Sequence, residues 1–303
     1  MTTEAGQVDA LQPQPPIRRL QADHLRLAAP AKINLNLLVG PRRGDGYHPI
    51  DSYVARITLY DLIDIRRRRD GAIVFSCQGA DCGDDDANLA LLAARALAEG
   101  RSVPGADIAL RKSIPPGSGL GGASSDGAAV LNGLNVLWEL SLPPEALAEL
   151  AGRLGSDVPL FLGPPASRIT GRGEQIQPLP VHPFLAVMYL PAVACQTSDV
   201  YAAYDRDQIT VDQQLDAGLL QQAPSAWRGR LRNHLAPAAL RTCRQLGDIW
   251  DALSRSIPQP VCLTGSGSGL FVLCDDPAEV RAVLACGGEN LVDRRIVVQQ
   301  NTW

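Results

Sequence analysis

Residues 115–126 read Pro115-Pro116-Gly117-Ser118-Gly119-Leu120-Gly121-Gly122-Ala123-Ser124-Ser125-Asp126, a glycine-rich loop that is expected to run directly into a helix. Four glycines within six positions remove the Cβ atoms that would keep a ligand away from the backbone. The bared N–H groups can converge on an anion, and the helix expected next adds unpaired N-terminal donors and a positive dipole end. The stretch therefore predicts a phosphate-binding loop.

The segments around this loop alternate between strand and helix patterns. A strand is expected over 107–114, leading into the loop, and a helix from the loop to about residue 140. Two further helical segments are expected over 144–154, ending at Gly155, and over 158–162, after Ser156-Asp157. The other elements expected in this half are strands over 25–39, 51–65 and 72–76, a hairpin turn at Asp70-Gly71, a helix over 87–99 capped by Asp86, and strand and turn over 168–179.

A second half is expected to begin near Pro180. It consists of a strand over 184–190, helical stretches within 198–253, strand, loop and helix over 261–286, and a final strand over 295–299. Two domains are therefore predicted, 23–180 and 181–303, after a disordered N-terminal extension over 1–22 that is rich in Gln and Pro.

Composition restricts the class of protein. The chain has 303 residues and a formal charge of −4, which gives no electrostatic reason to expect nucleic acid or a membrane surface as a partner. No apolar run approaches the length of a membrane span, and the first 22 residues lack the apolar core of a signal peptide. Seven scattered cysteines without CxxC spacing indicate reduced thiols in a cytoplasmic protein, and the four histidines form no metal pattern.

Only two of the 28 basic residues are lysines, Lys32 and Lys112. A lysine retained in such a chain indicates a site where a compact ammonium is needed and a guanidinium does not fit. Lys32 lies within the apolar run 28–39, where an unpaired charge is costly, so a functional role is favoured. For Lys112, chance retention is an equal alternative.

Other classes of glycine loop do not fit the sequence. A Walker loop ends in Gly-Lys-Ser/Thr, which is missing here. Gly117, Gly119 and Gly122 match the Rossmann spacing, but helix follows helix where a βαβ unit requires a strand. The lysine, HRD and DFG motifs of protein kinases and the G-x-S-x-G of serine hydrolases are also missing.

The pattern Pro-x-x-x-Gly-Leu-Gly-Gly-x-Ser-Ser over 115–125 resembles the central motif of the GHMP small-molecule kinases. Residues 30–35, PAKINL, resemble the first motif of that family, and residues 263–269, LTGSGSG, resemble its third. The resemblance implies an α+β fold with an N-terminal ribosomal-protein-S5-like domain and a C-terminal ferredoxin-like α/β sandwich domain. The active site is then expected between the two domains.

Further details resemble one branch of the family. These are GDGYH at 44–48, GSDVPLF at 155–161, TGRGEQI at 170–176 and QTSDVY at 196–201. That branch transfers the γ-phosphoryl group of ATP to the 2-hydroxyl of 4-diphosphocytidyl-2-C-methyl-D-erythritol, in the non-mevalonate isoprenoid pathway. The alternatives are a homoserine or mevalonate type of GHMP kinase and a non-catalytic nucleotide sensor.

The resemblance also implies roles for individual residues. Lys32 and Asp157 are the expected catalytic pair, with Asp157 accepting the proton of the attacking hydroxyl. Asn34, Tyr47, His48, Thr197 and Tyr201 are expected at the substrate, with cytosine between Tyr47 and Tyr201. The ATP phosphates are assigned to Pro115, Pro116, Gly117, Ser118, Gly119, Leu120, Gly121, Gly122, Ala123, Ser124 and Ser125.

Structural alternatives exist for several of these residues. Helix capping is the alternative for Ser125 and for Asp157, and core packing is the alternative for Tyr47 and Tyr201. Magnesium is expected to arrive with ATP and to keep several of its waters, so no protein ligand is assigned to it.

Overall fold

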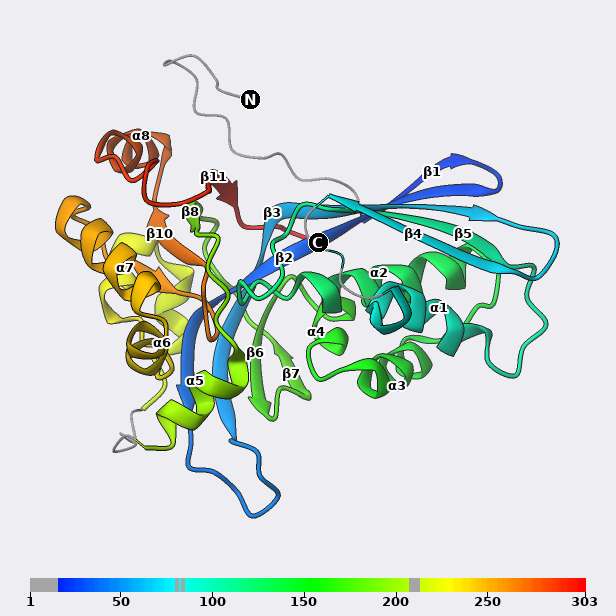
Figure 1. The fold of residues 1–303 in the computed structure, drawn as a ribbon, viewed down its shortest axis with the longest axis horizontal. Helices are drawn as coiled ribbons and strands as arrows, with labels where there is room; N and C mark the ends of the chain where they lie inside the picture. The colour runs from blue at the N-terminus through cyan, green and yellow to red at the C-terminus, as the bar shows by residue number, and fades with distance from the viewer. Residues whose placement is uncertain (1–15, 80–81, 83–84, 207–212) are drawn as a thin grey trace.

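The computed structural model of the chain describes residues 16–79, 82, 85–206 and 213–303, and has an α+β fold built on two sheets (Figure 1). The first sheet is organised by two long antiparallel strands, β2 (His24–Val39) and β3 (Ile50–Arg67). One end of β3 pairs with β5 and the other end with β6, and the strand order is β1-β2-β3-β5-β4. The remaining strands are β1 (Ile17–Gln21), β4 (Ile73–Gly79), β5 (Ala106–Lys112), β6 (Ala166–Gly171) and β7 (Gln175–Pro178).

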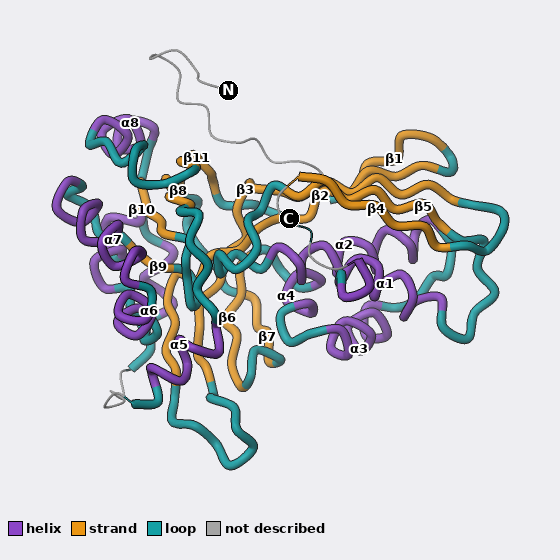
Figure 2. The backbone as a smooth tube through the Cα atoms, viewed as in Figure 1, coloured by secondary structure: helices purple, strands orange, loops and turns teal. Residues whose placement is uncertain are grey.

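Helices cover one face of this sheet, as the layers of strand and helix in Figures 1 and 2 show. Leu131 and Leu134 of the central helix are fully buried against Leu27, Ile63 and Ile65 of the strands. This apolar contact holds the helix that follows the glycine loop on the sheet. The helices are α1 (Leu89–Ala98), α2 (Gly122–Leu137), α3 (Pro144–Leu154) and α4 (Val158–Leu162).

The second sheet has the order β11-β8-β10-β9 and is antiparallel throughout. A separate apolar cluster joins it to the first sheet, because Ile33 and Tyr53 pack with Met188 and Phe271. The strands are β8 (Leu185–Leu190), β9 (Cys262–Leu263), β10 (Leu270–Cys274) and β11 (Arg294–Gln299). The helices of this half are α5 (Thr197–Tyr204), α6 (Ala236–Thr242), α7 (Arg244–Ser256) and α8 (Pro277–Ala285).

The hairpin predicted at Asp70-Gly71 is wrong. Gly71 does turn, with φ of 74°, but β4 pairs in parallel with β5 and not with β3. The turn is bonded to the start of β5, because Arg68 forms an ion pair with Asp107 and the Gly71 N–H donates to the Pro104 carbonyl. As a result, β4 lies on the side of β5 opposite β3.

Three other predictions need correction. The predicted extension over 1–22 lies mostly outside the described residues, but Ile17–Gln21 form β1, which pairs with β2. The first helix is capped by Asn88 and not by Asp86, because the Asn88 side chain accepts from the Ala90 N–H. Cys77 and Cys82 form a disulfide, so these two cysteines are not reduced in this structure.

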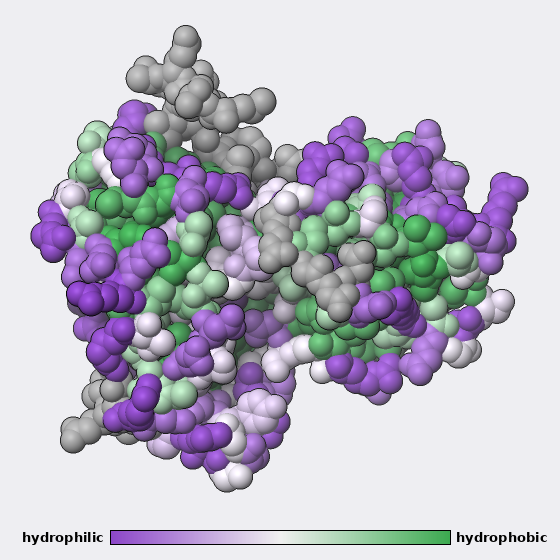
Figure 3. Space-filling model, viewed as in Figure 1, coloured by the Kyte–Doolittle hydropathy of each residue, from purple (hydrophilic) through white to green (hydrophobic). Residues whose placement is uncertain are grey.

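Within the described ranges, no helix has the length and apolar character needed to cross a membrane. Figure 3 shows hydrophilic side chains spread over the outer edges of the visible face, with hydrophobic ones between them. The strands of the first sheet end at Pro178 and those of the second begin at Leu185. The domain boundary near residue 180 stays a prediction.

Candidate active site

The glycine loop begins α2 through its backbone alone. Gly121 is the N-cap, its φ is 70°, and no side chain caps the helix. Gly117 and Gly119 also have positive φ, of 66° and 74°, a region that glycine enters without strain. The loop lines a cavity of about 300 Å³. The lining residues are 114–124 together with Cys82, Asn88, Lys112 and Asp126.

A second glycine loop, residues 263–269, supports the first by backbone hydrogen bonds. The Ser268 N–H donates to Gly117 O over 3.2 Å, and the Gly269 N–H donates to Ser118 O over 2.9 Å. A Cβ at Gly119 would lie 2.3 Å from the Thr264 carbonyl oxygen, so only glycine fits there. The two motifs therefore form one structural unit.

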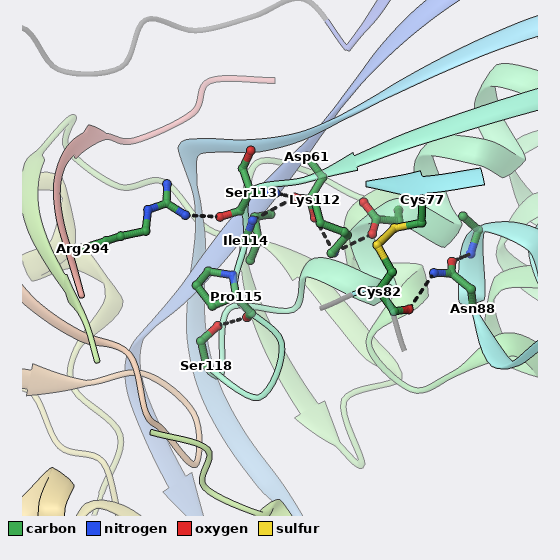
Figure 4. Close-up of polar contacts among 12 residues, drawn as sticks. Asp61, Cys77, Cys82, Asn88, Lys112, Ser113, Ile114, Pro115, Ser118 and Arg294 are labelled. Carbon is green, nitrogen blue, oxygen red and sulfur yellow. Dashed lines mark hydrogen bonds and ion pairs between the residues drawn. A yellow bond between two sulfur atoms is a disulfide. The ribbon is translucent and has the colours of Figure 1, made fainter. Parts of the chain in front are cut away.

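Lys112 lies under the loop in a buried cluster of charges (Figure 4). Its Nζ donates to Asp61 over 2.5 Å and to Asp126 over 2.8 Å, and Asp61 also accepts from the backbone N–H of Ile114. Burial lowers the pKa of Lys112, but the two carboxylates outweigh it and the pKa lies above its usual value. Burial and Asp61 raise the pKa of Asp126 well above its usual range. The compact ammonium of Lys112 thus bridges two carboxylates. This contact favours a structural requirement for lysine over chance retention.

A second cavity, of about 630 Å³, collects all the residues expected at the reaction centre and the substrate. Gly119 and Gly121 line this cavity as well as the one at the phosphate loop, so the two cavities meet at the loop. A group held by the loop can therefore face a molecule in the second cavity. The predicted residues that line it are Lys32, Asn34, Tyr47, His48, Asp157, Thr197 and Tyr201.

Lys32 lies on β2 and is buried. Its Nζ donates to the side-chain oxygen of Asn34 over 2.6 Å, and the Asn34 amide in turn donates to Ser52 over 2.8 Å. Burial lowers the pKa of Lys32, and the charge of Asp157 acts in the opposite direction. The ammonium and this carboxylate are therefore electrostatic partners in the site.

Asp157 stands immediately before α4, whose second residue is Pro159. Its backbone is helical and its side chain makes no capping hydrogen bond, so the capping alternative is wrong. Burial raises the pKa of Tyr201 to about 12, and the Asp157 charge adds to this shift. The carboxylate thus acts on both Lys32 and Tyr201, across the second cavity.

Tyr47 and His48 lie in the loop between β2 and β3. Tyr47 is 54% exposed, which rules out core packing, and the Arg172 guanidinium lies 4.2 Å from the centre of its ring. His48 is buried between Tyr201, with ring centres 5.2 Å apart, and Asp205, whose Oδ1 is 3.1 Å from His48 Nε2. Tyr201 also packs on the core of the C-terminal half. Stacking of a base between Tyr47 and Tyr201 stays a prediction.

Ser125 departs from the expected arrangement. It does not line the loop cavity; it lines a separate cavity together with Arg56 and Trp303, and its hydroxyl is buried. Successive helical residues are rotated by about 100°, so Ser124 and Ser125 cannot face the same side. The capping alternative is also wrong for Ser125, since the N-cap is Gly121.

The lining residues that sequence reasoning did not assign to the site include Ser266, Arg172 and Asp205. Ser266 bonds to Thr197 through their hydroxyl oxygens, 2.9 Å apart. Its position within the LTGSGSG motif could have indicated that Ser266 belongs to the site. The position of Arg172 within TGRGEQI could have done the same. Asp205 carries no motif signal. Among the residues that the structure describes, no three His, Cys, Asp or Glu side chains gather as a metal site.

Comparisons with known proteins show which family the sequence is similar to. Residues 88–163 match the family described as GHMP kinases N terminal domain. The chain is 38% identical over 274 residues to 4-diphosphocytidyl-2-C-methyl-D-erythritol kinase of Thermobifida fusca (strain YX), covering 84% of this chain and 89% of that protein. It is 36% identical over 262 residues to the protein of the same name from Chlorobaculum tepidum, covering 84% and 91%.

Solved structures give the same result. The crystal structure of a 4-(cytidine 5'-diphospho)-2C-methyl-D-erythritol kinase superposes with a TM-score of 0.73 at 31% identity, covering 91% of this chain and 99% of that one. A homoserine kinase from Cytophaga hutchinsonii superposes with a TM-score of 0.69 at 18% identity, covering 94% and 96%, and so shares the fold. These matches confirm the predicted α+β fold and the resemblance to GHMP kinases.

Proposed function

The chain belongs to the 4-diphosphocytidyl-2-C-methyl-D-erythritol kinase family, a branch of the GHMP kinases, and we propose that it phosphorylates the alcohol 4-diphosphocytidyl-2-C-methyl-D-erythritol. The γ-phosphoryl group of ATP is transferred to the 2-hydroxyl of 4-diphosphocytidyl-2-C-methyl-D-erythritol. The observation that carries this proposal is the meeting of two cavities at Gly119 and Gly121, with Lys32 and Asp157 on the acceptor side.

The phosphate loop binds the tail of ATP through the N–H groups of residues 117–122 and the first turn of α2. The acceptor hydroxyl lies between Lys32 and Asp157. Lys32 stabilises negative charge that develops on the oxygen, and Asp157 accepts its proton. A carboxylate is too weak a base to remove this proton in advance, so proton transfer occurs late in a loose transition state.

The cytidyl part of the substrate is assigned to the loop over 44–48 and the start of α5. The exposed Tyr47 ring offers a stacking surface, and Arg172 covers it from one side. His48, Thr197 and Tyr201 line the same cavity, and Asn34 lies beside the reacting hydroxyl. This assignment is supported by the shared cavity.

Magnesium is expected to bind together with ATP. Asp126 lines the cavity at the phosphate loop and Asp157 lines the second cavity. A side-chain oxygen at either cavity would accept a hydrogen bond from a water of the hydrated ion, which suits a cation that keeps most of its waters. When bound, the ion neutralises charge on the phosphates. We also assign the enzyme to the cytoplasm and place its domain boundary near residue 180.

A phosphorylation assay tests the proposal. The chain is given ATP with 4-diphosphocytidyl-2-C-methyl-D-erythritol, homoserine or mevalonate in parallel. Turnover with the cytidyl alcohol alone is expected. Turnover with one of the other two would assign a different GHMP kinase activity, and ATP binding without any turnover would leave a nucleotide sensor.

A further inference from the structure

Arg56 carries a buried charge that the proposed reaction does not use. It lies on β3 directly opposite Lys32 of β2, and residues opposed in this way share one face of the sheet. Only 4% of Arg56 is exposed, and no Asp or Glu side chain of the described ranges forms an ion pair with it. Burial lowers the pKa of Arg56 to about 10, so the guanidinium remains charged at neutral pH. A buried cation is costly unless its contacts compensate for the lost hydration.

Arg56 makes most of its side-chain contacts with the end of α4, and its Nη1 also donates to Trp303 O over 3.3 Å. Its Nη2 donates to Leu160 O and to Gly163 O, each over 2.7 Å. The guanidinium also lies 5.9 Å from the centre of the Phe161 ring. The last carbonyls of a helix have no partners within it, and a cation there complements the negative end of the dipole. Arg56 therefore acts as the C-terminal cap of α4.

The other end of α4 carries the proposed proton acceptor, since Asp157 directly precedes Val158. The helix has five residues and is only about 7 Å long, at about 1.5 Å per residue. A helix this short is not stable by its own hydrogen bonds, so its position depends on contacts at its ends. A shift at Leu160 and Gly163 is transmitted over one and a half turns to Asp157.

The middle of α4 packs into the site through Phe161. A Cβ added at Gly121 would lie 2.9 Å from Phe161 Cζ and 3.2 Å from Lys32 Cγ. The Phe161 ring and the Lys32 stem thus both lie against Gly121 of the phosphate loop. Arg56 therefore contacts both the Phe161 ring and the carbonyl groups at the end of α4.

We propose that Arg56 is a positioning residue, which fixes Asp157 relative to Lys32 by anchoring the C-terminal end of α4. The proposal rests on the proposed function, because it assigns Arg56 to the geometry of that reaction. Arg56 lines neither of the two cavities of the site, so it does not contact ATP or the acceptor. Its effect is therefore on turnover and not on binding.

The test compares Arg56→Met, Arg56→Lys and a control, Arg168→Met. Arg168 lies on β6 of the same sheet and pairs with Asp51 away from α4. For Arg56→Met, kcat is expected to fall about 10- to 100-fold, the cost of a misplaced catalytic group. The KM values for ATP and the cytidyl alcohol are expected to stay within about three-fold, since neither cavity loses a contact.

Two further results are expected. Arg56→Lys, which keeps the charge and a donor, recovers part of the lost kcat, and Arg168→Met stays within about two-fold of the starting protein. Hydrogen–deuterium exchange of the amides over 158–163 rises in Arg56→Met and not in the control. If Arg56→Met does not fold, the test uses Arg56→Lys. In that variant a kcat lower than that of the starting protein and faster exchange over 158–163 would support the proposal.

The proposal would be overturned if kcat were unchanged in the folded Arg56 variants. It would also be overturned if both KM values rose by as large a factor as kcat fell. Exchange that stays slow in α4 would overturn it as well. If the starting protein does not phosphorylate the cytidyl alcohol, the proposed function fails instead. The exchange measurement still reports whether Arg56 anchors α4 in that case.

Discussion

Lys32 Nζ lies 2.6 Å from Asn34 Oδ1, and the two residues are on the same strand, β2. The amide oxygen accepts a hydrogen bond without neutralising the ammonium, so the charge of Lys32 remains available to Asp157 and to an anionic substrate. Ser52 holds the Asn34 amide in turn. The lysine head is thus fixed in direction while its charge is kept.

Replacing Asp157 by Asn removes the proton acceptor and keeps the shape of the side chain. Turnover is expected to fall about 10²- to 10⁴-fold, the usual contribution of a general base. ATP affinity is expected to be retained, because Asp157 does not line the phosphate-loop cavity. Steady-state kinetics and ATP titration measure the two quantities. Undiminished turnover would remove Asp157 from its assigned role.

Replacing Lys32 by Arg keeps the charge but not the geometry. The Lys32 side chain is buried and its Nζ already lies 2.6 Å from Asn34 Oδ1, so the wider guanidinium has little room. We expect kcat to fall about 10²-fold or more, close to the loss caused by Lys32→Met. A Lys32→Arg enzyme with near-normal kcat would mean that positive charge alone suffices.

The lowered pKa of Lys32 predicts opposite effects of alkaline pH on activity and stability. Turnover needs the protonated amine, so it falls at a pH below the ordinary lysine value of 10.5. Over the same interval the unfolded chain binds more protons at this residue than the folded chain, so its contribution to folding stability rises with pH. Rate profiles and denaturant unfolding at several pH values measure the two trends.

The carboxylate of Asp157 opposes the downward shift of the Lys32 pKa. In Asp157→Asn the alkaline limb of the residual activity is therefore expected at a lower pH than in the starting protein. An alkaline limb at the same pH in both proteins would show that a different group titrates.

Replacing Tyr47 by Ala removes the exposed ring. The KM of the cytidyl alcohol is expected to rise about 5- to 100-fold, since stacking on a base is worth about 1–3 kcal/mol. The KM of ATP is expected to stay unchanged, and Tyr47→Phe keeps the ring and serves as the control. Equal rises in both KM values would place Tyr47 elsewhere in the mechanism.

Replacing Gly121 by Ala tests the phosphate loop. The new Cβ meets Phe161 at 2.9 Å in a residue with φ of 70°, so weaker ATP binding and a loss of about 1–2 kcal/mol of stability are expected. The control is Gly152→Ala, where nothing lies within 4 Å of the Cβ in α3, and a gain of about 0.5–1 kcal/mol is expected there. Thermal unfolding with and without ATP distinguishes the two. Similar melting curves for both variants would contradict the tight packing of the loop.

The sequence predicts those elements whose signals are local. The helix over 144–154 begins at a proline and ends before Gly155, and both boundaries agree with the structure. The segment over 158–162 and the loop before α2 follow in the same way. The position of β4 beside β5 depends on contacts between segments, which no local pattern records. The Cys77–Cys82 disulfide is local, with a sequence separation of 5, but this spacing matches no recognised cysteine motif.

The membership of the site is predictable from motifs, but side-chain direction is not. The residues named from the first motif and from the loops around 47, 157 and 197 line one cavity. Ser125 belongs to the motif and still faces away, because its direction is set by the rotation of α2. The Arg172–Tyr47 contact and the Arg56 anchor join strands and loops more than 100 residues apart, so they follow only from the tertiary structure.

The bonds from Ser268 and Gly269 to Gly117 and Ser118 have a consequence for synthesis of the protein. As the chain leaves the ribosome, the phosphate loop emerges about 150 residues before the segment that fixes its carbonyls. Until residue 269 is released, Gly117 and Ser118 lack these partners, so a nascent chain cannot yet hold the nucleotide in its final geometry. Competence to bind ATP therefore arises late in translation, when the last quarter of the chain docks onto a loop made long before.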